Sequence, residues 1–300
     1  MLALKIKCQF RHENGNSFSL MLHSSRFIIS FLFCFFFFSF LSLSVVFCQV
    51  QVFNSPVDGI MVRSGAMSRD AWAFFTNPAG TALNPVLAAG AGYESTFHLS
   101  DLSSRAAFAV FPNRYGVVSG GFSQYGFSSF NLQQYSVAFA REMAPWLRLG
   151  IKGTRMVRYQ QSYGSHGIFL MDAGLQIMPS SQFAIGFFTA NPSRQKWDLD
   201  NHSEYHVSYS AASILYEPSS GLFLELGLIK EMEEDAVVSF SVEAPVHQQV
   251  NLRGGVSSAP LRMAFGAGLE WEMIRFDAGI NHHPTLGFSS AFGIVYVIKR

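Results

Sequence analysis

The stretch Leu261–Met273, LRMAFGAGLEWEM, alternates between two kinds of side chain at every second position. One set is mostly bulky and apolar and comprises Met263, Phe265, Ala267, Leu269, Trp271 and Met273. The other set is small or charged and comprises Arg262, Ala264, Gly266, Gly268, Glu270 and Glu272. Because successive side chains of a β-strand point to opposite faces, this pattern predicts a strand with one apolar face and one face of small and charged residues.

The same alternation recurs along most of the chain, and turn-forming residues separate the alternating stretches. Turn signals include Pro112-Asn113-Arg114, Pro179-Ser180-Ser181 and the run 217–221. A strand of an outer-membrane barrel needs about 9–11 residues, with every second side chain facing lipid. The pattern predicts about fourteen such strands, at 86–97, 104–112, 115–125, 132–141, 146–159, 167–178, 181–189, 205–217, 221–230, 235–244, 247–257, 261–273, 274–283 and 287–298.

Alternation by itself also fits a soluble β-sandwich or a soluble exported barrel. The predicted strands differ from those of a soluble sheet on both faces. Nearly every strand has bulky residues on its apolar face, and the opposite faces are rich in Gly, Ala and Ser with scattered charges. The sequence therefore predicts an all-β fold, a transmembrane antiparallel β-barrel, and short turns at one end with longer loops at the other.

Residues 1–48 read as a leader rather than as part of the fold. Arg26 precedes a hydrophobic block, Phe27–Phe47, and Cys48-Gln49 follows it, which is the layout of a secretory signal peptide. Met21 is an alternative start. Two other interpretations stay open: the block is long enough to be an uncleaved anchor, and Cys48 is a candidate for lipidation.

Cysteine and charge usage agree with export. The three cysteines are Cys8, Cys34 and Cys48, so cleavage after Cys48 leaves no thiol for a disulfide, a metal site or catalysis. The leader holds four of the 21 basic residues and one of the 20 acidic ones, which leaves a nearly neutral mature chain of 17 and 19. Without a Lys/Arg-rich run, the chain is not expected to bind nucleic acid.

Residues 49–85 do not alternate and precede the expected barrel, 86–300. Ser68 is a candidate cap for a short helix running through Phe75. Asn77-Pro78 is expected to end that helix, since the residue before a proline avoids the helical region. We expect this segment to form a short plug inside the barrel.

Three stretches resemble the FadL-type outer-membrane proteins, a group that includes the long-chain fatty-acid transporter and the PorV/PorQ-like proteins of type IX secretion. Asp70–Gly80, DAWAFFTNPAG, is similar to the N-terminal signature of the group. Met171–Gly186 and Ile274–Ser289 are similar to a mid-barrel and a C-terminal hairpin of the PorV-like branch. The resemblance implies a fourteen-stranded barrel with its N-terminal segment folded inside as a hatch.

The chain departs from the transporter branch in its length. About 250 mature residues suffice for fourteen membrane strands with short loops, and they leave little for the large extracellular loops that capture a substrate. This favours the PorV-like branch. The chain also ends in Lys299-Arg300, whereas outer-membrane barrels commonly end on an aromatic residue, and the nearest one here is Tyr296.

Charged residues at small-face positions are expected to point into the lumen: Arg148, Lys152, Asp172, Glu225, Glu243, Arg253, Glu270, Glu272, Arg275 and Asp277. They form either a network that holds the plug, with Arg63, Arg69 and Asp70 as partners, or a polar conduit or gate. In the plug, Trp72, Phe74 and Phe75 either pack on the wall or line an apolar ligand pocket. Asn77 and Pro78 are expected to shape a turn.

No catalytic arrangement stands out in the sequence. His282-His283 is the one adjacent histidine pair, and neighbours in a strand point to opposite faces, so a shared metal is not expected. No G-x-S-x-G motif is present. The sequence predicts a protein that is not an enzyme and needs no cofactor, located in the cell outer membrane in contact with its lipid. Three functions stay open: uptake of small hydrophobic molecules, secretion with an exported protein as partner, and a purely structural barrel.

Overall fold

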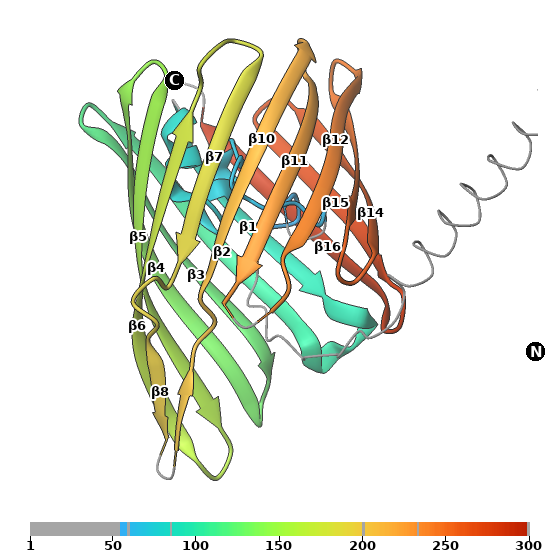
Figure 1. Ribbon diagram of the computed structural model, residues 1–300. Helices are drawn as coiled ribbons and strands as arrows, with labels where there is room; N and C mark the ends of the chain where they lie inside the picture. Colours follow the sequence, from blue (N-terminus) through green and yellow to red (C-terminus); the bar gives the residue numbers. More distant parts are fainter. Residues whose placement is uncertain (1–54, 59–60, 85, 200–201, 233, 299–300) are drawn as a thin grey trace, which may run out of the picture. The chain divides into compact units, whose positions relative to one another are not determined.

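The computed structural model describes residues 55–58, 61–84, 86–199, 202–232 and 234–298. The expected leader, 1–48, lies outside these residues. Residues 49–300 form one compact unit, and its described part is a closed antiparallel barrel of 14 strands (Figure 1). The last strand pairs with the first, so the sheet has no free edge in the ring. The predicted fold class and strand number are confirmed.

The bounds of the elements follow the predicted ranges closely. The barrel strands are β1 (Leu87–Ser95), β2 (Ser103–Asn113), β3 (Gly116–Phe127), β4 (Phe130–Ala144), β5 (Leu147–Gln160), β6 (Gly164–Ile177), β7 (Phe183–Ala190), β10 (Tyr209–Ser219), β11 (Leu222–Glu231), β12 (Val237–His247), β13 (Val250–Ser257), β14 (Arg262–Trp271), β15 (Ile274–His283) and β16 (Gly287–Ile298). A separate hairpin consists of β8 (Lys196–Leu199) and β9 (His202–Tyr205). The 3₁₀-helices are η1 (Ala71–Phe74), η2 (Pro78–Leu83), η3 (Thr96–His98) and η4 (Ser100–Leu102).

Two expectations about these elements are wrong. The sequence pattern predicts no strand at 190–204, but the hairpin β8–β9 begins at Lys196, and the barrel strand predicted at 205–217 begins only at Tyr209. Glu272 was expected to lie on a strand facing the lumen. It lies instead in the turn between β14 and β15, exposed and with a φ of 54°. A tight turn interrupts the alternation there, so its position in the pattern does not set its direction.

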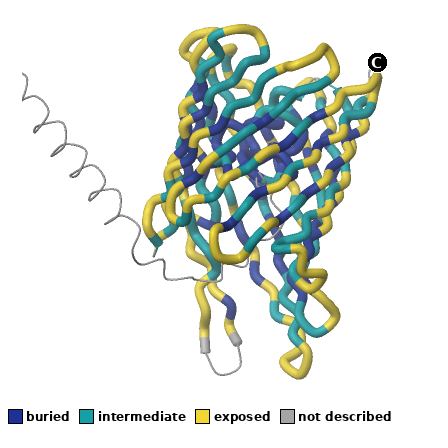
Figure 2. Tube along the Cα trace, turned by 90° about the vertical axis from the view of Figure 1, so that its right-hand side faces the viewer, coloured by how far each residue is buried: buried dark blue, intermediate teal, exposed yellow. Residues whose placement is uncertain are grey.

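The outer surface of the barrel is apolar. On β14, for example, Met263, Phe265 and Trp271 are 57%, 58% and 62% exposed. Buried positions gather inside the ring, whereas exposed positions alternate along its outside (Figure 2). The end where β1 begins and β16 ends, here named the turn end, has exposed Tyr115, Trp146, Trp271 and Tyr296. A girdle of aromatic residues at this level is typical of outer-membrane barrels and agrees with the expected location in the cell outer membrane.

The opposite end, here named the loop end, carries the longer connections. η3 and η4 lie between β1 and β2, and the hairpin β8–β9 lies between β7 and β10. The other connections at this end are short, so the expected asymmetry between the two ends rests on these two connections. No helix in the described ranges has the length and apolar character needed to cross a membrane.

The described residues 55–58 and 61–84, here named the N-terminal segment, lie inside the ring of strands (blue in Figure 1). The helix predicted through Phe75 is the single turn η1, and its cap is Asp70 rather than Ser68: the Asp70 side chain accepts from the backbone N–H of Trp72. Pro78 does not end a helix but begins η2, since its fixed φ suits the first helical position. η2 contacts β3, β4, β5 and β6.

Candidate functional site

Glycines on the inner wall let the backbone of the N-terminal segment approach the strands closely. A Cβ atom on Gly174 of β6 would lie 1.8 Å from Asn77 Oδ1, and one on Gly150 of β5 would lie 2.3 Å from the Ala79 nitrogen. No larger residue fits at either position while the segment keeps its place. The small lumen-facing residues of the sequence pattern therefore form the surface against which the N-terminal segment packs, here named the contact surface.

Asn77 packs on this contact surface and forms hydrogen bonds to both the segment and the wall. Its Oδ1 accepts from the backbone N–H of Ala79 at 3.0 Å and so caps η2, as Asn side chains do. Its Nδ2 donates to the carbonyl of Ala66 at 2.6 Å and to the carbonyl of Phe187 on β7 at 3.2 Å. The side chain is fully buried. Asn77 therefore shapes a turn and also joins the segment to the wall.

The aromatic residues of the segment pack against one another and against β2. Trp72 and Phe74 are fully buried. The Phe108 ring centroid lies 4.9 Å from that of Trp72 and 5.4 Å from that of Phe75. The Trp72 indole N–H donates to Asp277 Oδ2 on β15 at 3.0 Å. These aromatic side chains therefore pack against one another and on the wall.

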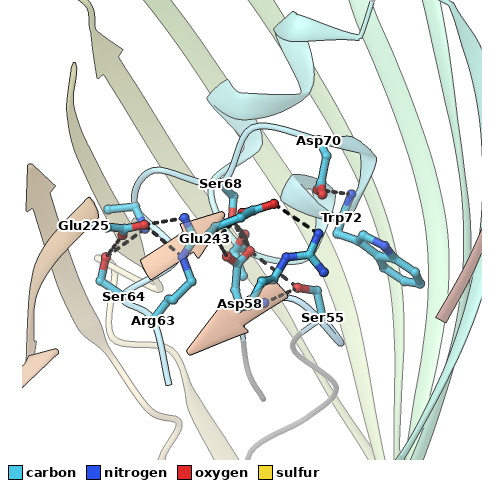
Figure 3. A network of polar contacts seen from close by, with 12 residues as sticks. Ser55, Asp58, Arg63, Ser64, Ser68, Asp70, Trp72, Glu225 and Glu243 are labelled. Carbon is cyan, nitrogen blue, oxygen red and sulfur yellow. Dashed lines mark hydrogen bonds and ion pairs between the residues drawn. The ribbon is translucent and has the colours of Figure 1, made fainter. Parts of the chain in front are cut away.

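A chain of buried ion pairs joins the segment to β11–β15 (Figure 3). Arg63 Nε donates to Glu225 Oε2 at 2.9 Å, and the Ser64 hydroxyl donates to Glu225 Oε1 at 3.2 Å. Arg63 also lies 3.7 Å from a carboxylate oxygen of Asp58 and from one of Glu243. The Arg63 and Glu225 side chains are only 6% and 3% exposed. In this surrounding an unpaired partner would be costly, so the two groups depend on each other.

The chain of pairs continues along the wall and returns to the segment. Arg253 pairs with Glu243 at 3.2 Å and with Asp277 at 2.7 Å. Arg275 pairs with Asp277 at 2.9 Å and with Asp70 of the segment at 2.8 Å. The predicted lumenal residues Glu225, Glu243, Arg253, Arg275 and Asp277 thus meet in one network.

The remaining predicted lumenal charges lie elsewhere. Arg148 pairs with the half-exposed Glu142 at 3.3 Å near the turn end. Lys152 and Asp172 form a separate pair on β5 and β6, with 3.1 Å between Nζ and Oδ2. Glu270 is exposed, opposite Arg275 in the strand register. Within strands, the alternation correctly predicts which face a charged residue occupies. It does not predict which charged residues pair, and it fails for Glu272 in the turn.

A polar cavity of about 150 Å³ lies between the segment and the wall and is lined by Val57, Asp58, Arg63, Ser68, Arg69, Asp70, Glu243 and Arg275. Burial raises the pKa of the Asp58 carboxyl above its usual range, against the opposing effect of Arg63. The Arg69 guanidinium stacks 3.5 Å from the Phe223 ring centroid, and burial lowers its pKa. This volume has room for about five water molecules, and its lining is mostly polar and charged.

Sequence reasoning missed Asp58 and Gln176. Asp58 accepts hydrogen bonds from the hydroxyls of Ser68 and Thr76, and no pattern distinguished it. Gln176 was visible on the small face of its strand, and its Nε2 donates to the carbonyl of Ser68 at 2.7 Å. Within the described ranges, no three His, Cys, Asp or Glu side chains gather as a metal site.

An apolar cluster lies nearer the loop end, on the inner face of β3–β6. Its buried members are Tyr125, Leu132, Met156, Ile168, Leu170 and Trp197. Trp197 comes from the hairpin β8–β9 and is 3% exposed, so the hairpin covers the cluster. Arg158 of β5 also pairs with the half-exposed Glu204 of β9 at 2.8 Å.

Alanine at Gly174 is expected to displace the N-terminal segment. The added methyl group would overlap Asn77 Oδ1, and overpacking of this kind costs about 1–3 kcal/mol. Hydrogen exchange measured by mass spectrometry should speed up in residues 66–84 and stay unchanged in β12–β16. Gly120→Ala is the matched control, because its Cβ would meet no atom closer than 3.9 Å. Unchanged exchange in Gly174→Ala would contradict the close seating.

Acidification is expected to loosen the hairpin through His206. Burial lowers the pKa of His206 below its usual value of 6.5, although Asp172 and Glu204 oppose this shift. The neutral ring is favoured when docked beside Trp197, with 6.1 Å between ring centroids, so the docked state loses stability as the pH falls below about 6.5. Proteolysis within 191–208 should become faster from pH 8 to pH 5. His206→Gln should remove this pH dependence, and an equal pH dependence in that variant would exclude His206 as its source.

No protein-family model matches the sequence, and no curated protein matches it. Solved structures do match. The toluene transporter TodX of Pseudomonas putida superposes with a TM-score of 0.55 at 10% identity, over 83% of this chain and 98% of that one. The toluene transporter TbuX of Ralstonia pickettii gives 0.55 at 12% identity, over 83% and 98%.

A deltaS2 variant of TodX, described as a monoaromatic hydrocarbon channel, gives a TM-score of 0.56 at 9% identity, over 77% of this chain and 93% of that one. At such identities the likeness concerns the fold. These relatives in fold are transport channels rather than enzymes. The closed ring of 14 strands thus has a fold similar to that of these hydrocarbon transporters.

Proposed function

We propose that this protein is a non-enzymatic outer-membrane barrel that takes up small hydrophobic molecules, with residues 49–85 as a plug and 86–300 as the barrel. The observation that carries this proposal is the apolar cluster on the inner face of β3–β6, which is covered by Trp197 of the hairpin β8–β9. Apolar side chains on the inner face of a barrel are not in contact with lipid. We therefore expect this surface to bind an apolar ligand. The fold shared with toluene transporters supports the same role.

The N-terminal segment would close the channel on the turn-end side of that cluster. Its aromatic residues pack on β2, and its ion pairs reach β11 and β15, so it is attached to opposite parts of the wall. Passage of a ligand past this level requires the segment to shift. The cavity beside it is small and lined mostly by polar and charged residues, so it offers no apolar path of its own.

A secretion role of the PorV-like kind, with an exported protein as partner, is the second candidate. The observation that favours it is a set of exposed apolar side chains at the loop end: Leu99, Phe127, Tyr163, Tyr205 and Leu286. Exposed apolar side chains gathered at one end of a protein are typical of protein contact sites.

The test is to extract the native protein in mild detergent and to identify by mass spectrometry what stays bound. A stoichiometric hydrophobic molecule that is lost in Met156→Gln supports uptake, because Met156 is fully buried in the cluster. Met171→Gln is the matched control, since Met171 is 53% exposed on the outer face of the adjacent strand. A stoichiometric exported protein without a small ligand supports secretion. If neither a small molecule nor an exported protein is bound, the purely structural role is supported.

A further inference from the structure

The ion pair Lys152–Asp172 stands between two parts of the chain that are far apart in sequence. The two residues are register partners on β5 and β6, and 3.1 Å separates Lys152 Nζ from Asp172 Oδ2. Their side chains are 9% and 11% exposed. Neither residue takes part in the larger ion-pair network, so the pair needs its own explanation.

On one side the pair holds the N-terminal segment. Lys152 Nζ donates to the carbonyl of Phe75 at 3.3 Å, and Phe75 is the residue that ends η1. The Phe75 ring lies 5.0 Å from the Phe74 ring and 5.4 Å from the Phe108 ring, centroid to centroid. A shift of this carbonyl would therefore disturb the aromatic packing of the segment.

On the other side the pair holds the hairpin. Asp172 Oδ1 accepts from the backbone N–H of Asn191 at 3.1 Å. Asn191 is 1% exposed, and its Nδ2 donates to the carbonyls of His206 at 3.1 Å and Val207 at 3.3 Å. Asn191 thus ties together the two ends of the connection that carries β8–β9. Its φ of 48° lies in the left-handed region, where Asn is tolerated better than most residues.

We infer that Lys152 and Asp172 couple the hairpin to the N-terminal segment. When the hairpin lifts, Asp172 loses the N–H of Asn191, and its charge then attracts Lys152 more strongly. Because the Lys152 ammonium group then lies closer to Asp172, its hydrogen bond to the Phe75 carbonyl weakens. The N-terminal segment is then bound less tightly to the wall. This role rests on the proposed function. An apolar ligand that displaces Trp197 at the loop end would loosen the docking of the N-terminal segment on the wall.

The test is a double-mutant cycle read by hydrogen exchange of residues 70–84 in detergent, with no ligand added. Trp197→Ala undocks the hairpin and is expected to speed this exchange about fivefold or more, the lower end of typical coupling between sites. Asp172→Asn keeps the shape of the side chain and an acceptor for Asn191 but removes the charge that draws on Lys152. In that background Trp197→Ala should give no further increase, and Lys152→Met should behave in the same way.

Arg275→Gln is the control background. It loosens the segment through Asp70 without touching the hairpin, so Trp197→Ala should keep its full effect there. An equal effect of Trp197→Ala in all backgrounds, or no effect on residues 70–84 in the otherwise native chain, would overturn the coupling. Unchanged exchange in β12–β16 shows that each variant is folded. Since the assay uses no ligand, it separates failure of the coupling from failure of the uptake proposal.

Discussion

Replacing Trp72 with alanine is expected to release the N-terminal segment from the wall. The indole is fully buried, it contacts Phe108, and its N–H is bonded to Asp277. Removing a buried Trp side chain typically costs about 3–5 kcal/mol, and Asp277 would lose a donor as well. The strands keep their own hydrogen bonds, so the loss falls on segment docking. Conductance of the protein in planar bilayers should rise, and exchange in residues 61–84 should become faster.

Two variants make this result specific. Trp72→Phe retains most of the packing and should give a smaller effect than alanine. Trp271→Ala removes an indole that is 62% exposed on the outer wall and should leave exchange in 61–84 unchanged. If Trp72→Ala left both conductance and exchange as they are, the segment would not close the barrel.

Replacing Arg63 with methionine is expected to weaken the segment to a similar degree. Glu225 would remain buried with the Ser64 hydroxyl as a partner, Asp58 would lose the nearby Arg63, and Glu243 would keep Arg253. Breaking a buried pair by removing one partner typically costs about 3–5 kcal/mol. The lost docking energy should appear as faster exchange in residues 61–70 and as cleavage of the segment by added protease.

The double variant Arg63→Met with Glu225→Gln should recover part of the loss, because it removes the uncompensated charge. Arg148→Met is the control at an exposed pair, since Glu142 is 46% exposed; pairs of this kind contribute about 0–1 kcal/mol. A loss in Arg148→Met as large as in Arg63→Met would mean that the buried network has no special role in docking.

In the described residues, the lumen of the barrel is blocked at two levels. Aromatic packing, buried ion pairs and hydrogen bonds from Asn77 fix the segment to several strands at once. The apolar cluster near the loop end is in turn covered by Trp197. A protein that conducts hydrophobic molecules with this architecture has to release two closures, and the pair Lys152–Asp172 lies between them.

The sequence by itself determined the barrel. Strand periodicity is a local property: each residue of β14, Arg262–Trp271, faces lipid or lumen according to its parity, and the strand number follows from counting such stretches. The bounds 274–283 and 287–298 agree with β15 and β16. Parity also placed Glu225, Arg253 and Asp277 correctly on the inner face, where they are buried.

Only the tertiary structure decided which inner residues meet. Arg63 and Glu225 are joined across the lumen, and Gly174 receives Asn77 from a segment without strand periodicity. Such contacts depend on the closure of the ring and on the path of the segment through it, and neither leaves a repeating pattern in the sequence. The hairpin β8–β9 was missed for the same reason: its strands are short, and its stability comes from Trp197 packing on distant strands rather than from alternation.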